Sequence, residues 1–192
     1  MRSLLLALLC VSSLALTAQE QAPPQKGPRT HEIGLRLTSL DDFDFIYRRS
    51  ITNNSYRRYR IFAVDIDYLD NDSQTLSAIG AGFSIGKERR KSVVENFNFI
   101  YGPEFSLSLA YRHNEIQAGP ASQSETQYRV SPAIGYVLGF TYLVSDRFHI
   151  GIETIPSLSV GYTNREEGDE VRVSAGFNSN AIALTAVYRF TK

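Results

Sequence analysis

The stretch Val173-Ser-Ala-Gly-Phe-Asn-Ser-Asn-Ala-Ile-Ala-Leu-Thr-Ala-Val-Tyr-Arg-Phe190 decides the fold. Counted back from Phe190, every second residue as far as Ile182 is aromatic or aliphatic, whereas the alternate residues are small or polar and include Arg189. A period of two indicates a β-strand with two different faces. The apolar face ends in an aromatic pair close to the chain terminus. This pattern is typical of a barrel strand whose outer face meets lipid and whose aromatic residues mark the membrane edge.

The amino terminus has the features of an export signal. Arg2 supplies a short positive region, and residues 4–16 form an apolar run that is too short to span a membrane as a helix. We expect cleavage after Ala18, with Ala15 as the alternative. Cys10 lies inside the apolar run and follows a leucine, so we do not expect lipidation.

The rest of the chain reads as one β domain. Cys10 is the only cysteine, so the mature chain is expected to contain no disulfide and no thiolate metal site. We assign residues 1–18 to the signal peptide, 19–30 to a polar, proline-rich periplasmic lead-in and 31–192 to a single domain. The formal net charge is +0, which disfavours nucleic acid as a partner because nucleic-acid binding needs a basic stripe. No later apolar run approaches the length of a membrane helix, so a secreted soluble β domain and an outer-membrane barrel remain open.

Alternating faces predict eight strands, an even number that allows a sheet to close on itself with both termini on the periplasmic side. We therefore expect an all-β, eight-stranded antiparallel up-and-down transmembrane β-barrel. In the third strand we place Phe62, Val64 and Ile66 on the outer face, and we expect a bulge at Pro103. The expected strands cover residues 32–38, 43–48, 58–69, 76–88, 97–112, 128–142, 148–162 and 173–190. The connections are Asp41-Asp42 and the polar segments 50–55, 70–75, 89–95, 113–126, 144–146 and 163–170.

Aromatic residues gather at both ends of the predicted outer face. They come from several strands that run in both directions, which favours a membrane barrel over a soluble sandwich. Outer-membrane lipid is then the surrounding medium, and we expect a monomer. The belt at the outer end holds Phe43, Tyr68, Tyr111, Tyr128 and Tyr162. The belt at the periplasmic end holds Tyr47, Phe97, Tyr142, Phe148, Tyr188 and Phe190.

Six short motifs occur in order along the mature chain. They are Glu32-Ile-Gly-Leu-Arg-Leu37, Phe45-Ile-Tyr-Arg-Arg49, Gly86-Lys-Glu-Arg-Arg90, Tyr101-Gly-Pro-Glu104, Leu143-Val-Ser-Asp-Arg-Phe148 with Gly151-Ile-Glu153, and Tyr188-Arg-Phe190. With these motifs the chain resembles the small outer-membrane β-barrel proteins of Bacteroidota. The resemblance implies a porin-like barrel in the outer membrane of a Gram-negative bacterium, inserted by the barrel-assembly machinery, with no shared enzymatic activity. Thr191-Lys192 follow the final aromatic residue, which departs from the usual terminal signal for assembly.

The residues predicted to face the lumen carry charges of both signs. The interior of an eight-stranded barrel is just wide enough for side chains to fill it. Buried opposite charges are expected to pair, because an unpaired buried charge costs several kcal/mol. We expect a network that plugs the lumen, with a narrow ion path as the alternative. The predicted network consists of Arg36, Arg48, Asp65, Asp67, Glu88, Glu104, Arg112, Arg129, Glu153 and Arg189.

The sequence offers little for catalysis or metal binding. The nearest catalytic candidate is His149 with Glu153 and Ser157, but their inward parity does not suit a lipid-modifying enzyme. His31 and His113 have no supporting ligand cluster, so we expect neither a metal nor a cofactor. The polar connection 113–126 and the acidic stretch 164–170 are the places where an extracellular ligand, a cation or a host surface protein, would bind.

Overall fold

The structure is a computed structural model that describes residues 29–39, 42–71, 74–118, 121–165, 168–176 and 182–191. The predicted signal peptide, Cys10 and almost all of the predicted lead-in lie outside the described residues. Among the described residues, no helix is long and apolar enough to cross a membrane.

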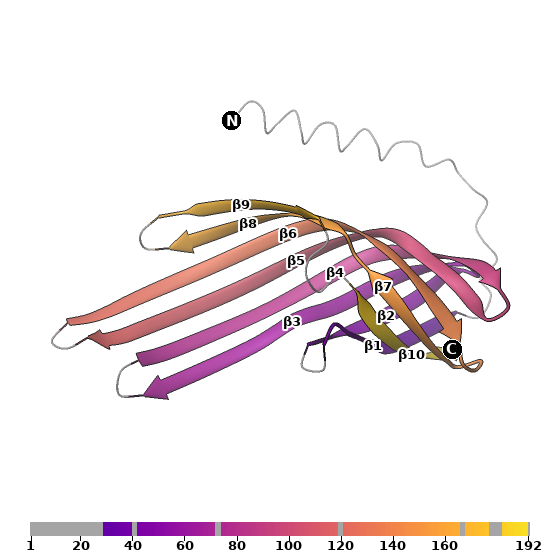
Figure 1. The fold of residues 1–192 in the computed structure, drawn as a ribbon, viewed down its shortest axis with the longest axis horizontal. Helices are drawn as coiled ribbons and strands as arrows, with labels where there is room; N and C mark the ends of the chain where they lie inside the picture. The colour runs from indigo at the N-terminus through magenta and orange to yellow at the C-terminus, as the bar shows by residue number, and fades with distance from the viewer. Residues whose placement is uncertain are drawn as a thin grey trace, which may run out of the picture.

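The described chain folds into ten β-strands, all paired antiparallel in one sheet (Figure 1). In chain order they are β1 (Thr30–Leu37), β2 (Phe43–Thr52), β3 (Ser55–Asn71), β4 (Gln74–Val94), β5 (Phe97–Ala118), β6 (Ala121–Leu143), β7 (Phe148–Thr154), β8 (Ser157–Arg165), β9 (Glu170–Gly176) and β10 (Ala183–Thr191).

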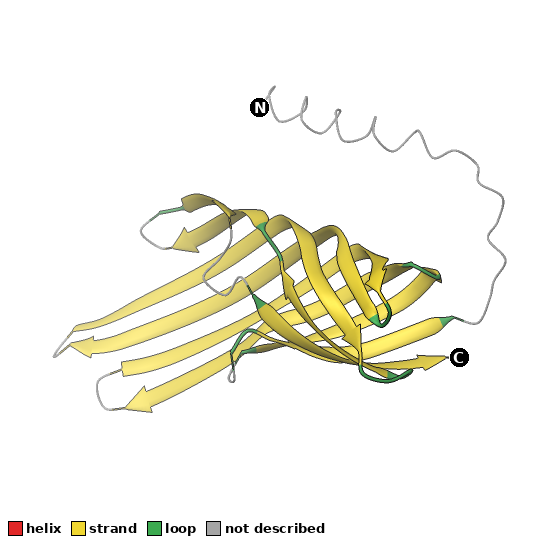
Figure 2. Cartoon of the chain, turned by 45° about the vertical axis from the view of Figure 1, so that its right-hand side comes forward, coloured by secondary structure: helices red, strands yellow, loops and turns green. Residues whose placement is uncertain are grey.

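Eight of these strands close into a ring. The first strand pairs with the last, from Thr30 opposite Thr191 to Leu37 opposite Leu184. Around the ring, β2 to β6 follow β1, each paired with its predecessor, and β7 joins β6 to β10 (Figure 2). Within the ring, closure gives each strand a hydrogen-bonded neighbour on both sides, which a barrel in lipid requires. The predicted fold class, an all-β antiparallel barrel of eight strands, is confirmed.

The last two predicted strands are each divided. Predicted strand 148–162 breaks at Ile155–Pro156 into β7 and β8, because proline has no N–H to donate to the ladder. The carbonyl of Pro156 still accepts a bond from the backbone N–H of Tyr136, at 3.0 Å, so β6 runs past the break and pairs with both pieces. Predicted strand 173–190 forms β9 and β10, and residues 177–181 between them lie outside the described chain.

Strands β3 to β6 continue beyond the closed ring and form, with β8 and β9, a curved sheet that we call the extension (Figure 1). The prediction of a long polar loop over 113–126 is wrong, because β5 reaches Ala118 and β6 begins at Ala121. The prediction of a turn over 89–95 is also wrong, since β4 runs to Val94 and the turn is at Glu95–Asn96. Both segments are predicted as connections because they are polar. Strand residues that lie outside the membrane or face the lumen do not need to be apolar, so polarity alone does not indicate a loop.

A bulge in β3 reverses the pattern that the sequence suggested. Ala63 has a positive φ of 50°, and the pairing with β4 shifts between Phe62 and Asp65. Two residues therefore oppose one at this point, so the side chains before the bulge point to the faces opposite to those expected. Beyond it, Asp65 and Ile66 keep the expected faces, opposite Gly80 and Ile79. Ile61 lies on the outer face, whereas Phe62 lines the lumen, so our assignment of Phe62 to the outer face is wrong. The expected bulge at Pro103 is also wrong, because Pro103 pairs with Tyr136 without a register shift.

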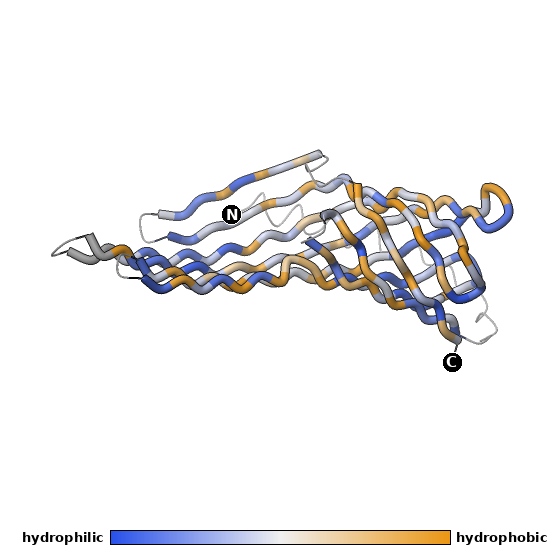
Figure 3. The backbone as a smooth tube through the Cα atoms, turned by 60° about the horizontal axis from the view of Figure 1, so that its bottom comes forward, coloured by the Kyte–Doolittle hydropathy of each residue, from blue (hydrophilic) through white to orange (hydrophobic). Residues whose placement is uncertain are grey.

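The barrel is polar inside and apolar outside. Its buried side chains include many charged residues, whereas large apolar residues such as Phe45, Ile134 and Leu184 are half or more exposed. Along the tube in Figure 3, apolar and polar residues alternate on the strands of the ring. Nine of the eleven predicted belt residues are exposed, and Phe97 and Tyr111 are half-buried. Phe97 stacks on Phe140 with ring centroids 5.3 Å apart, and Tyr111 lies 5.0 Å from Tyr128.

Candidate functional site in the barrel lumen

The centre of the lumen holds five arginines and five carboxylates, and no side chain among them is more than 11% exposed. Alternation along each strand turns every second residue inward, so six strands contribute to one charged core. The residues are Glu32 and Arg36 from β1, Asp44 and Arg48 from β2, Arg58 and Arg60 from β3, Glu88 and Arg90 from β4, Glu104 from β5 and Glu153 from β7.

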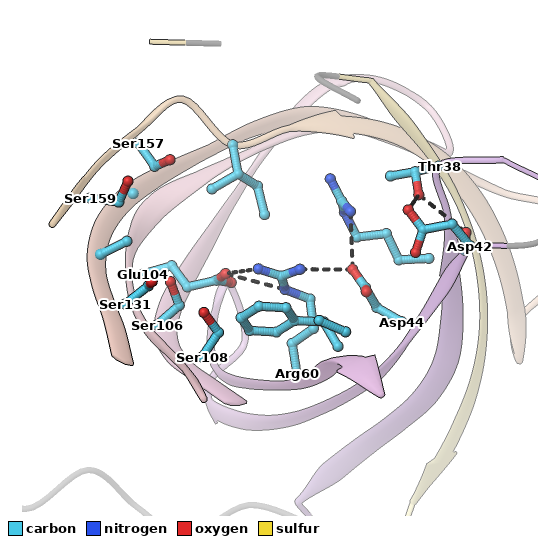
Figure 4. A pocket seen from close by; sticks show the side chains of 16 residues that line it. Thr38, Asp42, Asp44, Arg60, Glu104, Ser106, Ser108, Ser131, Ser157 and Ser159 are labelled. Atoms are coloured by element: carbon cyan, nitrogen blue, oxygen red, sulfur yellow. Dashed lines mark hydrogen bonds and ion pairs between the residues drawn. The ribbon is translucent and has the colours of Figure 1, made fainter. Parts of the chain in front are cut away.

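Six of these side chains form a closed cycle of alternating charge, which we call the charge ring. It runs from Asp44 to Arg36, Glu153, Arg58, Glu104, Arg60 and back to Asp44. The Arg60 guanidinium bridges Asp44 at 2.7 Å and Glu104 at 2.9 Å, as Figure 4 shows. Each arginine of the charge ring thus contacts two carboxylates, and each carboxylate contacts two arginines. Such mutual pairing offsets the large penalty of removing charges from water.

A second group of charges, the lower cluster, lies on the side of the chain termini. Glu88 contacts the guanidinium of Arg90 at 2.8 Å, and Arg90 in turn contacts Glu32 at 2.6 Å. Glu32 also accepts from Arg189 of β10 at 3.1 Å. Arg58 lies 3.3 Å from Glu88 and so connects the charge ring to the lower cluster. The two layers together cross the lumen from wall to wall.

Arg48 differs from its neighbours in how it is held. Its side chain is completely buried, and its Nε lies 2.8 Å from Glu88. None of its three nitrogens makes a well-aligned hydrogen bond to a described residue. Glu153 at 3.5 Å and Glu32 at 3.8 Å complete a shell of carboxylates around it. Arg48 is therefore held by surrounding charge more than by directional bonds, which are the stronger kind of contact.

The structure brings six of the ten predicted network residues together and leaves four apart. Arg36, Arg48, Glu88, Glu104, Glu153 and Arg189 make the contacts described above. Asp65, Asp67, Arg112 and Arg129 do not belong to the network, and their assignment to it is wrong. All four are exposed because they lie on the extension, where water rather than a facing strand solvates them. The Arg129 side chain donates to the hydroxyl of Thr163 at 3.2 Å.

Five network residues are absent from the set that the sequence predicts. Uninterrupted alternation along β3 puts Arg58 and Arg60 on the outer face, because it does not include the bulge at Ala63. Arg90 falls in a predicted turn, although β4 continues through it. Glu32 and Asp44 carry inward parity in their strands and could have been found by extending the same alternation.

A cavity of about 450 Å³, which we call the vestibule, lies beside the charge ring. Arg36, Asp44, Arg60 and Glu104 of the charge ring form its floor, and Thr38 and Asp42 of the β1–β2 connection lie at one side (Figure 4). The facing wall consists of hydroxyl side chains from three strands. These are Ser106 and Ser108 of β5, Ser131 of β6, and Ser157 and Ser159 of β8.

The predicted catalytic and metal candidates do not form a site. His149 is buried with its Nε2 3.6 Å from Glu32, whereas Ser157 lines the vestibule. No hydrogen bond links His149 to Glu153 or Ser157 among the contacts of the described residues, so they lack the geometry of a nucleophile and base. His31 lies 2.7 Å from the Tyr47 hydroxyl, and His113 lies 3.0 Å from that of Thr126. The described residues contain no cluster of metal-ligating side chains.

The fold and the buried charges define a class of protein: a small antiparallel β-barrel with an apolar exterior and an interior crossed by ion pairs. Solved structures similar to this chain are small outer-membrane β-barrel proteins. No protein-family model matches the chain, and no curated protein sequence matches it.

Three of the similar structures illustrate the likeness. A major outer membrane protein from Thermus thermophilus is 7% identical, with 84% of this chain and 99% of that chain covered and a TM-score of 0.47. Ail, the attachment invasion locus protein of Yersinia pestis, solved with the heparin analogue sucrose octasulfate, is 17% identical, with coverage of 86% and 100% and a TM-score of 0.45. CarO2 of Acinetobacter baumannii is 8% identical, with coverage of 87% and 100% and a TM-score of 0.40. At these identities the likeness concerns the barrel architecture alone.

Proposed function

We propose that this protein is an integral outer-membrane β-barrel of a Gram-negative bacterium that anchors a surface-exposed sheet and neither conducts ions nor catalyses a reaction. The observation that carries the proposal is its reversed polarity, with charged residues buried and large apolar residues exposed on the ring. In water, an exposed apolar surface of this extent would drive association, whereas in a bilayer it is solvated by lipid. The resemblance of the six motifs to those of Bacteroidota barrels supports an origin in a Gram-negative bacterium and insertion by the barrel-assembly machinery.

The ion pairs support a closed lumen over the alternative of a narrow channel. An ion that crosses the barrel has to pass the charge ring and then the lower cluster. Glu153 of the charge ring and Arg48, which contacts carboxylates of both groups, are completely buried and so offer no water-filled path. Opening a path means separating several buried pairs, each of which is strongly destabilising to break.

The extension supports a surface role. It lies at the end of the barrel opposite the paired chain termini (Figure 2). With the termini in the periplasm, the extension reaches into the medium, where Arg165 and Glu170 form a partly exposed ion pair at 3.0 Å. We propose that the barrel acts as a monomer in this role, with extracellular partners met at the tips of the extension.

Conductance tests the proposal directly. The full chain, refolded and inserted into planar lipid bilayers, is expected to give no current steps when a porin measured under the same conditions does. Reproducible steps in the nanosiemens range would establish the channel function instead. Mass spectrometry of lipid A from cells with and without the protein addresses lipid modification, and a new lipid species that depends on expression would overturn the non-enzymatic proposal.

A further inference from the structure

The vestibule contains more hydrogen-bonding capacity than the protein itself uses. The five serine hydroxyls of its wall are half-buried, and none has a hydrogen-bond partner among the described residues. Each hydroxyl can donate one bond and accept two. The wall therefore presents several neutral donors and acceptors to the cavity. Because β5, β6 and β8 are paired neighbours, with Ser108 opposite Ser131 and Ser159 opposite Ala133, these hydroxyls form a continuous surface.

The floor of the vestibule determines which charge a ligand can carry. Arg36, Arg60, Asp44 and Glu104 are already engaged in ion pairs with one another or with Glu153. A charged ligand would find no free counter-ion on the floor, and it would have to separate an existing pair to obtain one. A neutral ligand can instead share the outer lone pairs and N–H groups of these residues without breaking a pair.

The cavity also has an apolar side and a suitable size. Phe62, Ala63, Ala133 and Ile155 contribute apolar groups to its lining. The Phe62 ring is held in place by the Arg60 guanidinium, which lies 4.3 Å from the ring centroid. Small-molecule sites in proteins have volumes of about 300–1,000 Å³ and combine apolar walls with a few placed polar groups.

We propose that the vestibule binds a small uncharged carbohydrate or a polyol of similar size. Such a molecule has hydroxyl groups around its edge to match the serines and the charge ring, and C–H faces to pack against Phe62 and Ile155. The same chemistry is offered by a free sugar and by the end of a glycan chain. The site is distinct from the tips of the extension, and it requires neither catalysis nor an open lumen.

Binding is tested with the full chain refolded into lipid nanodiscs, by saturation-transfer difference NMR. The probes are glucose and sucrose as uncharged ligands, and glucuronate and glucosamine as charged ligands of similar size. We expect saturable transfer to at least one uncharged probe and weaker transfer to the charged ones. Maltohexaose forms a further arm: binding of glucose alone indicates a free sugar, and binding of both indicates recognition of a chain end. The absence of saturable binding by both uncharged probes, or a preference for a charged probe, would overturn the proposal.

Two substitutions at one position connect the signal to the vestibule. Ser108→Ala removes a hydroxyl and is expected to raise the Kd about 3- to 10-fold, the effect of one lost hydrogen bond. Ser108→Leu fills the cavity and is expected to abolish binding. Ser124→Leu is the matched control, because Ser124 is exposed on β6, on the face of the sheet opposite to that of Ser131 and outside the vestibule, and it should leave the Kd unchanged. Ser159→Leu provides a second filling variant in case Ser108→Leu does not fold. Unchanged binding in a folded filling variant would contradict the assignment of the site.

Discussion

Glu153 contacts three interior arginines and links the charge ring to Arg48, so Glu153→Gln is an informative single change. Its carboxylate accepts from the Arg36 Nε at 2.9 Å, and Arg58 donates to both of its oxygens. Arg48 lies 3.5 Å away, and the Glu153 side chain is completely buried. Glutamine has the same shape but no charge, and its amide group would face arginine donors with donors of its own. Removal of one partner from a buried ion pair costs about 3–5 kcal/mol, and we expect a loss in that range.

The assay is reversible urea unfolding of the barrel in lipid vesicles, followed by circular dichroism because the chain contains no tryptophan. With an m-value of about 2 kcal/mol/M, the loss lowers the urea midpoint by about 2 M. Glu170→Gln is the matched control. Glu170 also contacts two arginines, at 3.0 and 2.9 Å, but its side chain is 35% exposed. Exposed pairs contribute about 0–1 kcal/mol, so the control midpoint should barely move.

The same variant tests the closed lumen, because loss of Glu153 loosens the charge ring and the contacts of Arg48 together. We expect Glu153→Gln to admit current that the native protein blocks. Equal midpoints for Glu153→Gln and Glu170→Gln, with no change in conductance, would refute the view that buried charge pairing both stabilises and closes the barrel.

Three further tests, two of them with a matched comparison variant, address the assignment of faces and two backbone positions. Leu107→Arg places a cation on the lipid face of β5 and should lower the folding stability in lipid by about 2–4 kcal/mol. Ser108→Arg should cost less, because Ser108 points into the vestibule. Equal effects would contradict the assignment of alternate β5 residues to the lipid and the lumen. Gly102→Ala should destabilise the barrel severely, because a Cβ at this position would overlap a backbone carbonyl of β4. Gly161→Ala should be mild, because the atom nearest to an added Cβ there is a flexible serine oxygen at 3.4 Å. Similar unfolding midpoints for the two alanine variants would disprove this reasoning. Ala63→Gly should stabilise the barrel by up to about 1 kcal/mol, because a positive φ is unfavourable for residues with a Cβ; a lower urea midpoint would show that the bulge is not strained.

The sequence by itself determined the class of fold and the polarity of the barrel. Alternation over stretches such as 97–112 and 128–142 fixes which side chains share a face, and it is a local property that needs no partner strand. For this reason the eight-stranded barrel and the inward direction of Arg36, Glu104 and Glu153 could all be predicted.

Only the tertiary structure decided which charges meet. The bulge at Ala63 depends on how β3 fits against β4, and it turned Arg58 and Arg60 inward against the local pattern. The height of the closed ring is set by the short strands β1 and β2. Asp65 and Arg129 lie beyond that height, on the extension, and so have no facing strand across a lumen. Periodicity gives the face on which a residue lies but not its height along the barrel, and ion pairing needs both, because charges pair only within about 4 Å.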